Sequence, residues 1–137
     1  MRIVLKGRCI SKGKGEGEAL VSREPISFVG GVDPDTGRVV ERGHELEGEV
    51  IKGKVLIFPH GKGSTAGSWI VYAVSKRGTA PSAIINREAE PIVATGAVIG
   101  DIPMLDRVDP DPFSVIETGD FVRVDADNGI IEVEKKG

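Results

Sequence analysis

Short runs of valine and isoleucine, punctuated by glycine and proline, constrain the fold of this chain more than any other feature. The 137 residues include 19 glycines and eight prolines. Between these breaks, apolar side chains alternate with the period typical of strands. We expect strands near residues 2–9, 17–22, 54–58, 82–86, 104–108, 120–125 and 129–134. The last two flank Asn128-Gly129, and Asn-Gly is the strongest short signal for a hairpin.

Two segments have features of helices instead. The first is predicted to begin near Thr65 and to end at Lys76 or Arg77, with Gly78 as a left-handed C-cap. The second falls within residues 88–101, where Pro91 suits the first turn and nearly continuous apolar residues predict burial. No repeat, low-complexity tract or linker divides the chain. We therefore predict one mixed α/β domain, mostly β, over residues 1–137.

Composition excludes several classes of function. Basic and acidic residues are intermixed, 18 against 21, and aromatic residues make up only 4%, so neither a basic face nor a stacking platform for nucleic acid is expected. The sequence contains no run of about 18 apolar residues, which is the length needed to span a membrane. One cysteine, Cys9, can form no internal disulfide and cannot alone hold zinc or an iron–sulfur cluster. We expect a soluble, cytoplasmic chain that binds no metal, nucleic acid or membrane.

The stretch GKGST, residues 61–65, carries the main chemical signal. Its glycines allow a tight turn, and Ser64 or Thr65 can cap the helix that follows. The free amides of a first helical turn, with the charge of Lys62, can bind a small phosphate or carboxylate. The phosphate-loop motif of nucleotide hydrolases is excluded because Gly63 stands between the lysine and Ser64. Spacing alone leaves a second interpretation open, in which Ser64 only caps a helix.

Ser64 cannot become a base through this chain alone. A helix amino terminus contributes about 0.3 to 2 kcal/mol, or roughly one pKa unit. A catalytic triad would need a histidine and a carboxylate in place, and the sequence offers only His44 and His60. If Ser64 acts as a base, further positive charge must therefore come from another chain.

Other polar residues are expected to have structural roles. In the turns of residues 30–37, Asp33 can accept backbone amides as an Asx-turn, and turn chemistry alone is a sufficient interpretation. The spacing excludes a calcium loop. The two histidines are expected to be loop residues with satisfied hydrogen bonds. Two pairs of carboxylates are expected to be solvated or to do no chemistry: Glu88 with Glu90, and Asp109 with Asp111.

Several motifs together resemble one known family. They are GGVDPDTG at 30–37, GKGSTAGS at 61–68, INREAEPIVATGAVIGDIP at 85–103, and GDFVRVD followed by NGIIEV in residues 119–133. In this order they resemble the small subunit of the aconitase X family, its swivel domain. The resemblance implies a swivelling β/β/α domain like the mobile fourth domain of aconitase.

The resemblance also implies an activity. In archaeal members the small subunit pairs with a large subunit to form phosphomevalonate dehydratase. That enzyme uses a [4Fe-4S] cluster to remove water from (R)-5-phosphomevalonate, which gives trans-anhydromevalonate 5-phosphate in a modified mevalonate pathway. The large subunit supplies the cluster ligands and most substrate contacts. The cluster iron takes the departing hydroxyl while a serine of the small subunit takes a proton from the adjacent carbon.

Site residues follow from the same resemblance. The position that matches the family's catalytic serine is Ser64. Lys62 and the backbone amides from Gly63 through Ala66 would stabilise the charged serine or hold a substrate anion, with Thr65 among them. Asp33 is expected to line the same cleft.

Three other functions remain open at this level. Bacterial relatives include dehydratases of cis-3-hydroxyproline, with the same fold and serine. The ending GDFVRVDADNGIIEV also resembles phosphohistidine swivel carriers, although such a carrier needs a histidine in the loop that opens the central helix, and GKGSTAGS has none. The third is a binding module without catalysis.

Overall fold

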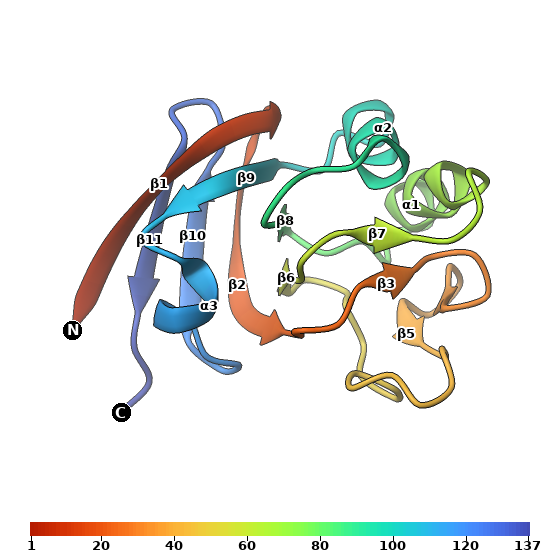
Figure 1. Ribbon diagram of the computed structural model, residues 1–137, viewed down its shortest axis with the longest axis horizontal. Helices are drawn as coiled ribbons and strands as arrows, with labels where there is room; N and C mark the ends of the chain where they lie inside the picture. The colour runs from red at the N-terminus through yellow and green to blue at the C-terminus, as the bar shows by residue number, and fades with distance from the viewer.

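The computed structural model describes residues 1–137 and contains a closed barrel of seven strands in the order β1-β11-β10-β2-β6-β8-β9 (Figure 1). These strands are β1 (Arg2–Ser11), β2 (Lys14–Val21), β6 (Val55–Ile57), β8 (Ala83–Ile85), β9 (Met104–Asp109), β10 (Phe121–Asp125) and β11 (Ile130–Glu134). All seven predicted strands are present. The prediction of a mostly β fold with small helices is confirmed.

Four two-residue strands and three helices complete the fold. The strands pair as β3 (Ile26–Ser27) with β7 (Gly61–Lys62), and β4 (Val32–Asp33) with β5 (Arg38–Val39). The helices are α1 (Gly67–Lys76), α2 (Pro91–Ile99) and α3 (Pro112–Val115). Helices α1 and α2 lie on the opposite side of the molecule from β1 and β11 (Figure 1). The sequence analysis missed the short strands and α3 because two to four residues show no period.

The barrel is mixed, and its parallel strands separate two apolar cores. Strands β2, β6, β8 and β9 pair in parallel, whereas β1, β10 and β11 pair antiparallel. Along β6, Val55 and Ile57 face one core and Leu56 faces the other. Both faces of β6 and β8 are therefore buried, which is why they read as continuous apolar runs.

Helix α1 ends, and helix α2 begins, where their sequences indicate. Gly78, with φ of +74°, follows α1 in the left-handed conformation. Pro91 starts α2, but the expectation that this helix is buried is wrong, because Val98 is 51% and Ile99 45% exposed. The helix packs with one face only. None of the three helices has the length and apolar character needed to cross a membrane.

The hairpin predicted at Asn128-Gly129 is also present. Strands β10 and β11 pair with Asp125 opposite Ile130. The Asp125 carboxylate accepts hydrogen bonds from the backbone and side-chain nitrogens of Asn128. This closes the antiparallel side of the barrel, away from α1 and α2 (Figure 1).

Candidate active site

Ser64 lies on an exposed turn between the short strand β7 and helix α1. Its Oγ accepts one hydrogen bond, from the Ala66 amide at 3.2 Å, and its carbonyl accepts from Gly67 at 2.9 Å. The helix begins later than predicted, with Ala66 as an N-cap that makes no side-chain bond. Neither Ser64 nor Thr65 therefore caps α1, and the Ser64 hydroxyl hydrogen is committed to no acceptor within the chain.

The turn also presents unused backbone donors. The amides of Gly63, Ser64 and Thr65 donate to no acceptor in this chain. Gly63 has φ of +90°, and a Cβ there would lie 2.6 Å from the Ser27 Oγ. Only glycine fits this conformation and this close approach. Successive free amides in such a turn can bind an anion, as the sequence predicts.

Lys62 is held by a residue that the sequence analysis missed. Its Nζ lies 2.8 Å from Oε2 of Glu41, and the other oxygen of Glu41 accepts the Ser27 amide at 3.1 Å. Burial opposes ionisation of Glu41, but the hydrogen bonds from Lys62 and Ser27 hold the pKa of Glu41 below its ordinary value. Glu41 thus ties β3 to β7 directly before the Ser64 turn. No local pattern marks it, because its partners come from other segments.

Asp33 forms the predicted Asx-turn, with the Asp35 amide 2.9 Å from its Oδ1. The residues after it contact the far end of α1: Asp35 pairs with Arg77, and Pro34 accepts the Thr79 hydroxyl. Ser64 precedes the opposite end of this ten-residue helix, which is about 15 Å long. The structure therefore brings Lys62, Gly63 and Thr65 together with Ser64 but places Asp33 in no contact with them.

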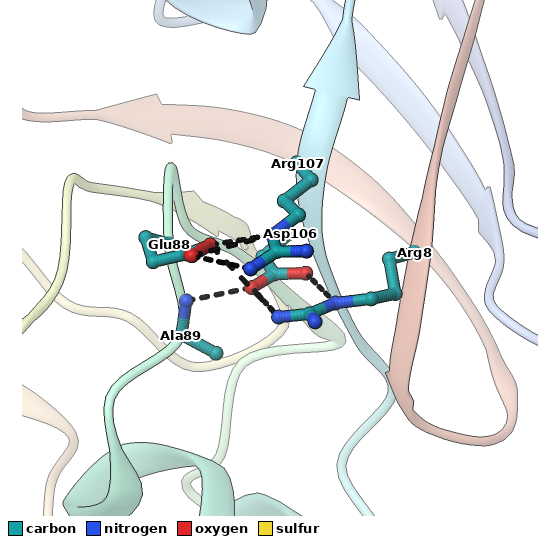
Figure 2. A network of polar contacts seen from close by, with 5 residues as sticks. All are labelled: Arg8, Glu88, Ala89, Asp106 and Arg107. Atoms are coloured by element: carbon teal, nitrogen blue, oxygen red, sulfur yellow. Dashed lines mark hydrogen bonds and ion pairs between the residues drawn. The ribbon is translucent and has the colours of Figure 1, made fainter.

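A second turn, between β8 and α2, is clamped by a buried carboxylate (Figure 2). Asp106 is fully buried and accepts from Arg8 Nε at 2.9 Å, Arg8 Nη2 at 2.7 Å and the Ala89 amide at 2.7 Å. Beside it, Glu88 pairs with Arg107 at 2.8 Å. The hydrogen bond from Arg107 holds the pKa of Glu88 below its ordinary value.

Strand β9 is irregular at this clamp. Arg107 has φ of +49°, and the register between β1 and β9 shifts between Lys6 and Arg8. Such bulges re-aim side chains, and here Arg107 points toward Glu88 (Figure 2).

The two turns meet at one edge of the parallel strands. Glu90 caps α2 by accepting the Ile92 and Val93 amides, each at 2.7 Å. Its Oε1 lies so near Gly61 that a Cβ there would be 2.4 Å away. Glu88 is solvated as expected, although it also pairs with Arg107, whereas Glu90 is half-buried and caps α2, which corrects the expectation for Glu90. Because ligands commonly bind beyond the carboxyl ends of parallel strands, this edge is the candidate active site.

The histidines take no part in the site. His44 is buried, and its Nδ1 accepts the Leu46 amide while its Nε2 lies 3.0 Å from the Pro25 carbonyl. His60 Nδ1 lies 2.7 Å from the Gly61 carbonyl. Neither ring contacts Ser64. Ser64 therefore has no imidazole base within this chain.

This chain does not fit an iron–sulfur cluster. Cys9 is an isolated, exposed thiol, and no three histidine, cysteine or acidic side chains gather as ligands. Two cavities are present, of about 400 and 230 Å³, lined by β2, β10 and β11 and by the Arg87–Arg107 region respectively. Neither includes Ser64. Ser64 therefore stands on open surface, outside both cavities.

Known proteins similar to this chain share its whole length. The model of a family described as aconitase X swivel domain matches residues 4–133. A Methanosarcina mazei protein called phosphomevalonate dehydratase small subunit is 56% identical over 135 residues, which cover 98% of this chain and 94% of that protein. A protein of the same name from Thermococcus kodakarensis is 56% identical over 97% of this chain and 98% of its own. The crystal structure of Thermococcus kodakaraensis aconitase X in its holo-form matches with a TM-score of 0.91 and 56% identity, over 97% of this chain and 99% of that one.

Proposed function

We propose, from the fact that this chain belongs to the aconitase X swivel domain family, that it is the small subunit of a phosphomevalonate dehydratase. It is then one component of a hydro-lyase and acts with a large subunit. The observation that carries the proposal is the 56% identity to the Methanosarcina mazei small subunit over nearly the full length of both chains. The exposed turn at Ser64 supports it, since a site without a cavity needs a second chain.

Ser64 is the proton acceptor in this proposal. The oxygen takes a proton from the carbon next to the one that bears the hydroxyl, and the C–H electron pair forms the double bond as the hydroxyl leaves. Ser64 Oγ accepts only one hydrogen bond, and three neighbouring amides are free. These donors favour a negative charge on the turn, whether on the serine oxygen or on the substrate. A second chain must close over them, because exposed amides in water stabilise an alkoxide too little.

The turn also binds the substrate in this proposal. Gly63 and Thr65 offer backbone amides to a carboxylate or phosphate. Lys62 adds its positive charge when its ammonium turns from the Glu41 carboxylate, its present partner, to the substrate anion. Asp33 has no assigned role, because its turn is tied to the other end of α1.

The iron–sulfur cluster that the family implies is assigned to the large subunit. The single, isolated cysteine of this chain supports that assignment. No step at the cluster is assigned to residues of this chain.

The test is turnover by the reconstituted pair. The purified chain and its large subunit, mixed without oxygen, should convert (R)-5-phosphomevalonate to the anhydro product, followed by mass spectrometry as a loss of one water. Either chain alone should give no product. Turnover of cis-3-hydroxyproline in place of phosphomevalonate, or turnover by this chain alone, would contradict the proposal.

A further inference from the structure

We propose that the large subunit docks on the outer face of α1, which we define as Trp69, Tyr72 and Lys76, with Trp69 as the central anchor. This inference rests on the proposed function, because it names the surface through which the two subunits meet. It adds an interaction site that neither the family nor the Ser64 assignment specifies.

Trp69 is the largest exposed apolar side chain and the only tryptophan of the chain. It is 66% exposed. Apolar side chains of this size are usually buried at least in part, and tryptophan dominates the energetics of protein interfaces. The opposite side of α1, formed by Gly67, Val71 and Val74, is buried in the core. The helix therefore needs nothing from Trp69 for its own packing.

The outer face of α1 is already ordered in the isolated chain. The Trp69 and Tyr72 rings meet edge to face, with centroids 6.2 Å apart and planes at 85°. Lys76 Nζ lies 5.7 Å from the centre of the Tyr72 ring. Aromatic pairs of this geometry restrain each other. A partner can bury such an anchor with little further loss of side-chain entropy.

The position of Trp69 identifies the large subunit as its occupant. The Trp69 amide donates to the Ala66 carbonyl at 3.0 Å, so residue 69 lies about one helical turn after the Ser64 turn along the chain. In the proposed function the large subunit must cover Ser64, and the outer face of α1 continues that covered surface. A second copy of this chain would cover Ser64 without bringing a cluster or a substrate, and the two copies would each carry a net charge of −3.

The unpaired charge of Lys76, at the edge of this face, indicates which charge the partner surface should carry. Lys76 makes no ion pair within the chain, whereas Arg77 beside it is paired with Asp35. An uncompensated cation next to an exposed aromatic pair fits a partner surface that is apolar at its centre and acidic at its edge. We therefore expect the large subunit to present a pocket for an indole with a carboxylate facing Lys76.

The single tryptophan makes the test direct. The chain is prepared with 5-fluorotryptophan, which gives one ¹⁹F resonance, and is titrated with unlabelled large subunit while gel filtration confirms the complex. Burial of the indole should shift and broaden this resonance and abolish its change between H₂O and D₂O. A resonance that stays solvent-sensitive in a confirmed complex would overturn the proposal.

Two variants give an independent measurement. Trp69→Ala should raise the Kd for the large subunit at least tenfold, with turnover regained when the large subunit is in excess. Val4→Ala removes another exposed apolar side chain, 51% exposed on β1 across the molecule (Figure 1), and should leave Kd unchanged. Equal affinities for Trp69→Ala and the unaltered chain would refute the docking face, as would a Trp69-dependent dimer of this chain alone in sedimentation experiments.

Failure of the proposed function gives a different result. A pair that forms through Trp69 but dehydrates no phosphomevalonate contradicts the function and supports the docking face. A pair that dehydrates phosphomevalonate while Trp69 stays solvent-exposed supports the function and contradicts the docking face.

Discussion

Two turns at the same edge of the barrel are built in opposite ways. In the turn between β8 and α2, the buried Asp106 carboxylate accepts three hydrogen bonds, and Glu90 caps the helix that follows. In the turn before α1, the Ser64 hydroxyl accepts one bond and three consecutive amides donate to nothing in the chain. The first turn uses most of its polar groups to hold the fold, with the buried Asn86 Oδ1 as an exception that accepts no hydrogen bond, and the second leaves them available.

The difference shows where this chain can act chemically. Polar groups that are already satisfied cannot bind a substrate without first giving up a partner, whereas the Ser64 turn loses only water. The clamped turn still supports the open one, because Glu90 lies against Gly61 just ahead of Ser64. If this division is correct, changes in the open turn should affect activity, and changes in the clamped turn should affect stability.

Ser64→Ala should have the largest effect. Loss of a positioned proton acceptor typically costs a factor of about 10²–10⁴ in rate, while loss of one exposed side-chain bond should alter the free energy of unfolding by less than about 0.5 kcal/mol. Turnover of the reconstituted pair and thermal unfolding of the chain measure the two effects. Ser114→Ala, at an exposed serine outside the site, is the control. Near-normal turnover by Ser64→Ala would remove the assignment of this residue.

Asp106→Ala should give the opposite result. The Ala89 amide loses its only acceptor and the Arg8 guanidinium loses both of its bonds, which together should lower the free energy of unfolding by about 3 kcal/mol. The melting temperature should fall by roughly 10 °C. Turnover per folded molecule, measured well below that temperature, should stay within about threefold.

Asp109→Ala removes an exposed carboxylate from the same strand and should change stability by less than about 0.5 kcal/mol. The comparison between the turns fails if Asp106→Ala leaves stability intact but abolishes turnover.

Gly63→Ala should reduce both stability and turnover, whereas Gly78→Ala should reduce stability alone. Both glycines have positive φ, so each alanine should cost about 1 kcal/mol of stability. At Gly78 a Cβ meets nothing within 4 Å, whereas at Gly63 it meets Ser27 Oγ at 2.6 Å. Gly63→Ala should therefore distort the Ser64 turn and reduce turnover at least tenfold, while Gly78→Ala keeps full turnover. Equal turnover for the two variants would mean that the shape of the turn is unimportant.

A second buried carboxylate, Asp120, should make the stability of the fold depend on pH, and the expected effect is the smallest. Asp120 is fully buried and accepts from the Lys135 side chain and from the Glu117 and Lys136 amides. Burial opposes its ionisation, but these donors hold the pKa of Asp120 below its ordinary value.

Because the folded-state pKa is depressed, Asp120 should stabilise the fold above pH of about 4 and lose this contribution as the pH falls through its folded pKa. The difference in urea unfolding between the unaltered chain and Asp120→Asn should therefore be largest at pH 7 and shrink as the pH falls below about 4. A constant difference across this range would show that the Asp120 charge is not involved.

Local patterns were sufficient for the elements that have a period or a distinctive turn. Short apolar runs between glycine and proline breaks, alternating in most strands and continuous in β6 and β8, located all seven barrel strands, and Asn128-Gly129 located the hairpin between β10 and β11. The start of α1 was placed too early, because Ser64 and Thr65 are good caps and nothing local shows that Ala66 takes the cap position. The burial of α2 was misjudged for a similar reason, since its apolar residues surround the helix while only one side meets the core.

The hydrogen bonds and ion pairs between distant segments could not be predicted from local sequence patterns. Arg8 and Asp106 are 98 residues apart, and Ala89 joins them from a third segment. Glu41 reaches Lys62 and Ser27 only after β3 and β7 have paired. Each contact depends on the closure of the barrel, which no window of neighbouring residues contains.

The sequence by itself determined the strand alternation, the glycine turn that carries Ser64, and the inability of one cysteine to hold a cluster, because each depends on residue type and nearest neighbours. The tertiary structure alone decided which carboxylates are clamped, which amides stay free, and that the Trp69 side chain of α1 is exposed. Those properties depend on which distant segments exclude water from one another, and only the folded chain brings these segments together.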